Sequence, residues 1–197
     1  MKEKFLDFCI TFLQKNNDYS ELELKKLRYG LEGIYLTLTK TIIILLVSVI
    51  LNIFIETLIC ILLFNIIRYF AFGFHAEKSF HCLLLSLFNF VAIPYVLLKV
   101  NNSLVLNIII CLICLVFILI FAPADTVKRP LKDKKKRMKR KVLTFLTGCL
   151  YTLLIVFLKN SFISDILVST LIITVIVINP ITYKIFGQPY NNYKKIN

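Results

Sequence analysis

The stretch from Arg68 to Cys82, RYFAFGFHAEKSFHC, holds the residues best suited to chemistry. His75 and Cys82 flank a short polar turn between two apolar blocks. A cysteine becomes a nucleophile when a nearby base removes its proton, and imidazole is the usual base. In one straight helix the two side chains would lie about 10.5 Å apart along the axis. A direct hydrogen bond therefore needs a turn centred near Glu77 and Lys78, or a second protomer.

This arrangement predicts a catalytic pair in which His75 is the general base and Cys82 the nucleophile. A second interpretation stays open, because a cysteine in a membrane helix is usually an inert, small apolar residue. His81 is a poorer base candidate than His75, since adjacent residues on a helix point about 100° apart.

Two further sets of basic side chains are candidates for binding substrate. Arg68 precedes His75 by two helical turns, and it either extends to the lipid headgroups or orients a peptide carboxylate or acyl oxyanion. The run Lys134, Lys135, Lys136 and Arg137 either holds its segment at an anionic lipid surface or binds an acidic peptide. Both alternatives are open at the level of sequence.

The elements that must position these residues are membrane helices. The chain is 58% hydrophobic with a mean hydropathy of +0.81, and it has 17 Phe against 11 acids. Its apolar residues form long blocks, and about 20 of them span a bilayer. We place six spans near 34–55, 57–74, 80–98, 104–124, 142–158 and 162–180. Pro94 is expected to kink the third span, which neighbouring helices tolerate.

Two amphipathic helices are expected before the first span, within residues 1–33. Phe5, Phe8 and Phe12 recur at helical spacing, and Ser20 with Glu23 forms a capping-box signature for the second helix. These helices either lie on the membrane surface or pack as a small cap on the spans. The prediction is thus an all-α polytopic protein with a single membrane-embedded domain over 1–197, its spans lying within 34–180.

Lys and Arg gather between the spans, where cytoplasmic loops carry an excess of them. The loop predicted at 125–141 carries ten, whereas the opposite loops near 99–103 and 159–161 carry one each. This pattern predicts a multi-pass protein of the cell membrane with both termini in the cytoplasm. It also accounts for the net charge of +13 without nucleic acid, for which no motif is present.

No spacing typical of a metal site or of a cofactor-binding loop is present, so we expect neither a metal nor a cofactor. Cys111 and Cys114 form a C-x-x-C pair inside an apolar span. Both sulfurs are expected to stay protonated and inert there.

The run Ala71-Phe72-Gly73-Phe74-His75-Ala76, followed by Cys82, resembles the signature of the accessory gene regulator B family. These are membrane endopeptidases of quorum sensing in Gram-positive bacteria, with Gly-Gly-x-His-Ala and a Cys seven residues after the His. His75 and Cys82 match that pattern, whereas Phe72 stands in place of the first Gly. The segment FAPADTVKRPL at 121–131 is similar to the family's Ala-Pro-x-Asp segment, and Asn179-Pro180 is a third match.

The resemblance implies a cysteine peptidase that cyclises its product. The substrate would be a precursor peptide with an amphipathic N-terminal part, a central signal sequence and an acidic C-terminal tail. Cys82 would release the tail and hold the signal sequence as a thioester, which an internal Cys or Ser of the peptide would close to a thiolactone or lactone. The resemblance also implies a homodimer embedded in membrane lipid.

Two other functions stay open from the residues alone. A non-catalytic transporter or peptide exporter would use Arg68, His75 and Asn89 to line a polar path. A scaffold for a two-component signalling system would need no reactive pair. The exporter is expected to tolerate Cys82→Ser, whereas the peptidase is not.

Overall fold

The computed structural model describes residues 2–16, 19–74, 79–100, 102–126, 130–159 and 161–194. Helices make up nearly all of these segments, as predicted. The chain divides into two compact units, an N-terminal unit of Met1–Leu46 and a larger unit of Val47–Asn197. The two units are described separately below.

The N-terminal unit holds α1 (Lys2–Asn16) and the first part of α2 (Glu21–Ile50). Ser20 caps α2 as predicted: its Oγ accepts from the Glu23 N–H at 3.4 Å, and its own N–H donates to the Glu23 carboxylate at 2.9 Å. Arg28 bridges the two helices through Glu3 at 2.6 Å and Asp7 at 2.9 Å. Such exposed ion pairs contribute little stability, whereas α1 also buries Leu6 and places the Phe5 ring 5.3 Å from the Tyr35 ring.

Helix α2 differs from the expected division at residue 33. The predicted second amphipathic helix and the predicted first span form one continuous helix of 30 residues. No proline interrupts residues 21–50, and extending an existing helix costs far less than nucleating a second one.

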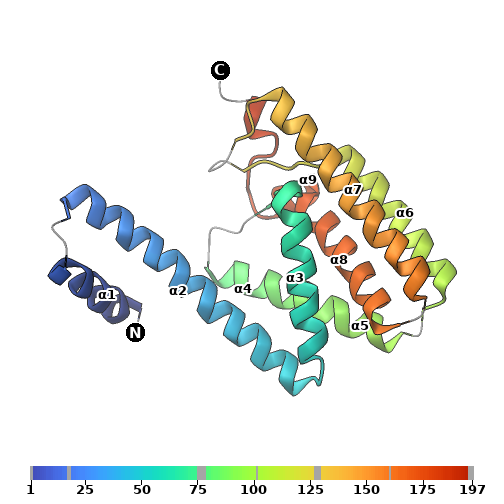
Figure 1. Cartoon of the computed structure of the whole chain (residues 1–197), viewed down its shortest axis with the longest axis horizontal. Coiled ribbons are helices and arrows are strands. Elements are labelled where there is room, and N and C mark those ends of the chain that lie inside the picture. The colour runs from blue at the N-terminus through green and yellow to red at the C-terminus, as the bar shows by residue number, and fades with distance from the viewer. Residues whose placement is uncertain are drawn as a thin grey trace. The chain divides into compact units, whose positions relative to one another are not determined.

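The larger unit is a bundle of helices (Figure 1). They are α3 (Phe54–Ala71), α4 (Ser79–Leu87), η1 (Phe88–Ala92), α5 (Ile93–Lys99), α6 (Leu104–Phe121), α7 (Lys134–Leu158), α8 (Phe162–Ile178), α9 (Pro180–Ile185) and η2 (Asn192–Lys194). Helix α8 packs against α3, α5, α6 and α7, so it forms the centre of the bundle.

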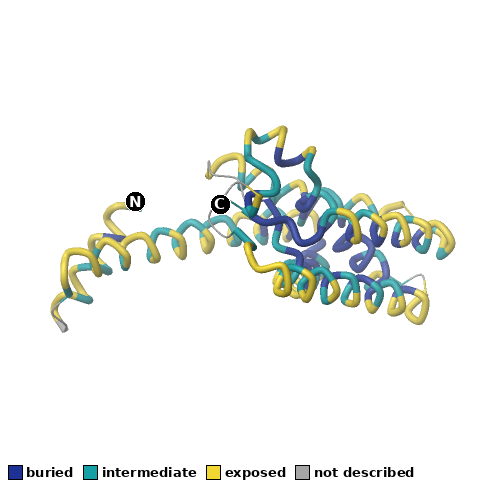
Figure 2. Tube along the Cα trace, turned by 90° about the horizontal axis from the view of Figure 1, so that it is seen from above, coloured by how far each residue is buried: buried dark blue, intermediate teal, exposed yellow. Residues whose placement is uncertain are grey.

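The bundle is apolar on its outside as well as inside. Large hydrophobic side chains such as Ile109, Leu112 and Val116 are exposed along α6, whereas Ser169, Thr170 and Thr174 are buried on α8. Figure 2 shows the buried segments inside the bundle and the exposed ones around it. Helices α2, α3, α6, α7 and the stretch Ser79–Lys99 are long and apolar enough to cross a membrane, and α8 is a shorter apolar helix. A multi-pass membrane protein follows, since lipid replaces water around such a surface.

The stretch from α4 to α5 is continuously helical, but its middle is not α-helical. Residues Phe88–Ala92 form a π-helical segment, in which the N–H of Ile93 donates to the carbonyl of Phe88. Pro94 lies at the start of α5 and has no N–H to donate. The predicted irregularity at this proline therefore takes the form of a π-helical segment.

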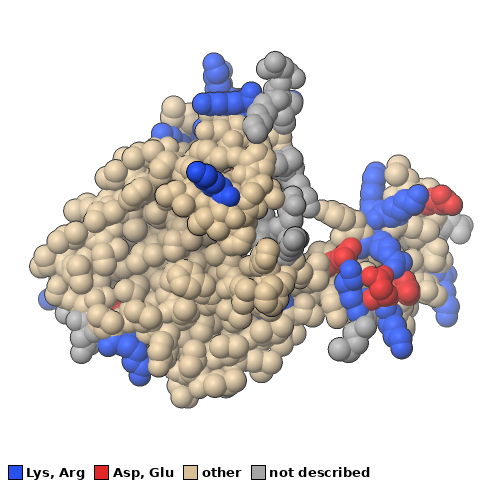
Figure 3. Space-filling model, turned by 180° about the vertical axis from the view of Figure 1, so that it is seen from behind, with Lys and Arg blue, Asp and Glu red and all other residues tan. Residues whose placement is uncertain are grey.

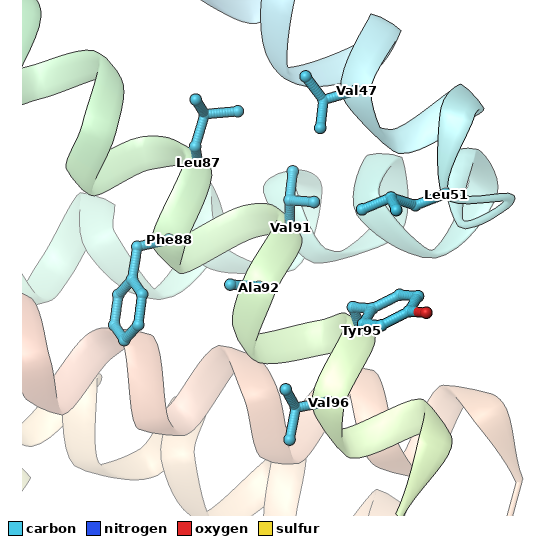
Figure 4. Close-up of a pocket in the computed structure, with 8 residues that line it drawn as sticks. All are labelled: Val47, Leu51, Leu87, Phe88, Val91, Ala92, Tyr95 and Val96. Atoms are coloured by element: carbon cyan, nitrogen blue, oxygen red, sulfur yellow. The ribbon is translucent and has the colours of Figure 1, made fainter.

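A pocket of about 370 Å³ lies between the helical stretch from α4 to α5 and the end of α2 (Figure 4). Its lining is apolar and consists of Val47, Leu51, Leu87, Phe88, Val91, Ala92, Tyr95 and Val96. None of the candidate site residues lines it.

The basic segment 125–141 is only partly a loop. Helix α7 begins at Lys134, and the Asp133 side chain caps it by accepting from the N–H groups of Lys135 at 2.8 Å and Lys136 at 3.4 Å. Helix α7 therefore begins two turns before the span expected at 142–158, because a capped, proline-free run of Lys and Arg is a good helix.

Candidate functional site

Three chain segments meet where α3, α6 and α8 end. After α3, the Gly73 N–H donates to the Ala124 carbonyl at 2.9 Å, and the Ala124 N–H donates to the Ala71 carbonyl at 3.0 Å. The Phe74 N–H donates to the Val177 carbonyl at 2.8 Å. Residues 71–74 are thus fixed by backbone bonds to α8 and to the segment after α6, directly before His75.

This junction requires unusual backbone angles. Gly73 has φ +119°, and a Cβ at this position would lie 2.6 Å from Val177 Cγ1. Phe72 has φ +59°, a conformation that favours glycine. The Arg140 guanidinium lies 4.3 Å from the centroid of the Phe72 ring. Phe72 stands where the family signature has Gly. Its backbone is strained, but its ring makes a cation–π contact with Arg140 that a glycine could not make.

Arg68 joins the junction to the start of α4. Its Nη2 donates to the Phe74 carbonyl at 3.0 Å, so it holds the peptide group that leads into His75. Cys82 and Tyr183 are close enough to Arg68 to interact with it electrostatically. The half-buried guanidinium therefore binds a backbone carbonyl instead of extending freely to headgroups.

Cys82 lies one turn into α4, is half-buried and packs against the bundle core. His75, with the rest of the turn at 75–78, lies outside the described residues. The predicted contact between His75 and Cys82 thus stays a prediction, while the residues on either side of the turn are placed. Cys111 and Cys114 are buried inside the bundle, far from solvent.

Asp125, the acidic residue of the Ala-Pro-Ala-Asp segment, binds backbone N–H groups far away in the chain, which the sequence did not indicate. Its buried carboxylate accepts from the N–H groups of Leu131 at 3.3 Å, Asn192 at 3.0 Å and Tyr193 at 2.8 Å. Burial raises the pKa of this carboxyl, and its backbone donors act in the opposite direction. The Asp125 side chain thus ties the C-terminal segment 186–194, termed here the C-terminal tail, to the end of α6.

Two tyrosines complete this attachment. The Tyr183 hydroxyl donates to the carbonyls of Ala124 and Asp125, both at 3.2 Å, and the Tyr190 hydroxyl donates to the Phe121 carbonyl at 3.2 Å. Burial raises the pKa of both phenols, so they stay protonated donors at neutral pH. Their acceptors are backbone carbonyls more than 50 residues away, which no local sequence pattern identifies.

The same end of the bundle is strongly basic. The candidate binding residues Lys134, Lys135, Lys136 and Arg137 form the first turn of α7. Figure 3 shows that Lys and Arg lie mainly toward the ends of the larger unit, whereas both charge signs mix on the N-terminal unit. Every ion pair among the described residues lies in the N-terminal unit. Among the described residues, the lysines of the basic end thus have no carboxylate within ion-pair distance.

Arg137 and Arg140 of α7 both contact other parts of the protein. Arg137 stacks on the Tyr193 ring, with its Cζ 3.4 Å from the centroid. Arg140 Nη1 donates to the Tyr69 carbonyl at 2.7 Å and so closes the last turn of α3. Arg137 therefore helps to hold the C-terminal tail, which leaves the three lysines as the better candidates for binding an external anion.

Comparison with known proteins agrees with this picture. The family model described as Accessory gene regulator B matches residues 7–181. An AgrB-like protein of Clostridium acetobutylicum is 34% identical over 193 residues, covering 97% of this chain and 91% of its own length. An AgrB-like protein of Listeria innocua is 35% identical, covering 86% and 83%.

The accessory gene regulator protein B of Staphylococcus aureus is 33% identical over 152 residues, covering 76% of this chain and 80% of the relative. No solved structure matches the chain. The matched segment includes the junction, Cys82, the basic start of α7 and all of α8. The chain belongs to the accessory gene regulator B family, and with it to the accessory gene regulator system of quorum sensing.

Proposed function

We propose that this protein is a membrane cysteine endopeptidase that removes the C-terminal tail of a small precursor peptide and cyclises the remaining signal sequence. The observation that carries the proposal is the placement of Cys82. Its half-buried thiol lies at the basic end of the bundle, within electrostatic reach of Arg68, and Arg68 fixes the peptide group that leads into His75.

The first chemical step is acyl transfer to Cys82. His75 takes the proton of the Cys82 thiol, and the thiolate attacks the carbonyl carbon at the end of the signal sequence. The C–N bond to the precursor's tail then breaks, and His75 returns the proton to the leaving amine. The product is a thioester between Cys82 and the signal sequence, with the tail released.

The second step closes the ring. An internal Cys or Ser of the bound peptide loses its proton to His75 and attacks the thioester carbonyl, and the proton passes to the departing Cys82 sulfur. Exchanging one thioester for another is nearly balanced in free energy, so release of the tail must drive the reaction. Water at the acyl-enzyme would give a linear product, and the half-buried position of Cys82 limits its access.

The basic end supports recognition of an acidic precursor tail. Lys134, Lys135 and Lys136 lie together on one helical turn, and Asp133 directs its carboxylate to backbone N–H groups of that turn. Among the described residues of the larger unit, no lysine or arginine forms an ion pair with a carboxylate. An acidic peptide segment would supply the missing charge, and the family's role implies a precursor peptide.

Catalysis is tested with the precursor and full-length protein in lipid vesicles. Cys82→Ser and His75→Gln are expected to abolish release of the precursor peptide's acidic tail. Cys149→Ser, which changes another half-buried cysteine, is expected to retain it. The acyl-enzyme is trapped when the internal Cys or Ser of the precursor is replaced by Ala, and mass spectrometry then locates the adduct on Cys82. Normal tail release by Cys82→Ala would refute the proposal and favour the exporter.

Peptide recognition is tested separately. Replacing Lys134, Lys135 and Lys136 with Gln is expected to weaken precursor binding and to flatten its salt dependence, because three charges no longer attract the acidic tail. The matched control replaces Lys25 and Lys26, which are also exposed but lie on α2. Unchanged affinity with weaker association with anionic lipid would show that the lysines serve the membrane surface instead.

We further propose that the basic end faces the cytoplasm, in accordance with the distribution of Lys and Arg. A membrane-impermeant maleimide added to intact cells is expected to label a cysteine introduced at Ser103, at the opposite end of the bundle. It is expected to leave one introduced at Lys134 unlabelled until the cells are opened. The reverse pattern would overturn the orientation.

A further inference from the structure

Phe186, the first residue of the C-terminal tail, contacts both sides of the turn that carries the candidate catalytic pair. Its ring stacks on Phe74, with centroids 4.8 Å apart and planes 28° from parallel. It also lies 6.0 Å from the His81 ring. Phe74 directly precedes His75 and His81 directly precedes Cys82. One side chain from the end of the sequence is thus adjacent to the neighbours of both candidate reactive residues.

We propose that Phe186 is a positioning residue, which sets the separation of the two chain segments that carry His75 and Cys82. The inference rests on the proposed function, since it assumes that these two residues react together. Phe186 itself touches neither the substrate nor the reacting atoms. It acts as a spacer between the end of the α3 segment and the start of α4.

Phe186 is held from the N-terminal side by α9. Asn179 caps this helix by accepting from the Ile181 N–H at 2.9 Å, and the Phe186 N–H donates to the Thr182 carbonyl at 3.2 Å. Tyr183, one turn before Phe186, is bonded to the carbonyls of Ala124 and Asp125 and packs edge-on against Phe74. The start of the tail therefore has a fixed place against the junction.

The tail is also held beyond Phe186. The Gln188 N–H donates to the Tyr183 carbonyl at 2.8 Å, and Asp125 binds the N–H groups of Asn192 and Tyr193. Arg137 covers the Tyr193 ring from α7. The backbone is thus anchored on both sides of Phe186, and the ring itself is held by its contacts with Phe74 and His81.

A spacer at this place matters because the paired residues must meet within hydrogen-bond distance. A misplacement of about 1 Å lowers the rate of such a reaction by roughly 10²-fold. Replacing the Phe186 ring with a methyl group removes the contact to both Phe74 and His81 and lets the two segments move. Leucine fills part of the same space, so it is expected to restore part of the lost activity.

The test compares Phe186→Ala, Phe186→Leu and Ile185→Ala in the full-length protein. Ile185 is the matched control, because it is the neighbouring residue and is 72% exposed. Two quantities are measured: kcat and KM for precursor cleavage, and the rate of Cys82 alkylation by iodoacetamide against pH, with the Cys82 peptide quantified by mass spectrometry. Circular dichroism in detergent checks that the helices remain.

Phe186→Ala is expected to lower kcat about 10²-fold with little change in KM, and to move Cys82 alkylation to higher pH because the thiol loses its base. Phe186→Leu should be intermediate and Ile185→Ala unchanged. If Phe186→Ala fails to fold, the Leu variant decides by the same two readouts. Wild-type kcat and an unmoved alkylation profile in the folded variant would overturn the inference. Failure of the proposed function itself would appear separately, as precursor cleavage by Cys82→Ala.

Discussion

Substituting Gly73 with Ala is expected to disable the site without disturbing the rest of the bundle. The added Cβ would lie 2.6 Å from Val177 Cγ1 and 3.1 Å from the Val177 carbonyl oxygen. Alanine also adopts φ +119° only at a cost of about 1–3 kcal/mol. To relieve the overlap, residue 73 must move away from α8.

That movement breaks backbone bonds of the junction. The Gly73 bond to Ala124 and the Phe74 bond to Val177 are each worth about 1 kcal/mol. Together with the strain, the ordered junction loses about 3–5 kcal/mol, and its population falls roughly 10²- to 10⁴-fold. We expect precursor cleavage to fall by this factor and hydrogen exchange of residues 70–74 to rise, with helix content unchanged.

Gly187→Ala is the matched control. Gly187 also has a positive φ, +64°, but a Cβ there meets nothing within 4 Å. Its cost is limited to the backbone strain of about 1–2 kcal/mol, so activity should fall much less than in Gly73→Ala. Equal losses in the two variants would show that overlap with Val177 is not the cause. Gly73→Ala with activity within about twofold of the wild type would refute the reasoning outright.

Three further predictions concern the helices around the site. Asp133→Ala removes the cap of α7, so hydrogen exchange of its first turn should rise by the equivalent of about 1 kcal/mol. Arg140→Gln loses the charged bond to the Tyr69 carbonyl, which should lower stability in detergent by about 2 kcal/mol, and Arg140→Lys should not restore it fully. Tyr151→Phe removes the hydrogen bond that the Tyr151 hydroxyl of α7 donates to the Leu63 carbonyl of α3. This loss should lower the free energy of unfolding by only about 0.6 kcal/mol in thermal unfolding, because both residues lie within membrane-spanning helices.

Local patterns in the sequence determined the class of protein. The long apolar blocks predicted the membrane helices, and Ser20 with Glu23 predicted the cap of α2, because both signals involve residues close in the chain. The resemblance at His75 and Cys82 identified the family that the comparisons then confirmed. Local patterns did not locate the helix boundaries: α2 runs through the expected break at 33, and α7 begins at Lys134, within the segment expected to be a loop.

The tertiary structure alone decided how the site is held together. Arg68, Tyr183 and Arg140 bind backbone carbonyls, and every residue type has a carbonyl, so nothing in the sequence marks the acceptor. Asp125 likewise binds backbone N–H groups 67 and 68 residues away. Phe186 resembles any other apolar residue in the chain, and only folding brings it between Phe74 and His81. Sequence thus indicates which side chains are candidates for the reaction, whereas the contacts around them arise from long-range packing without a local pattern.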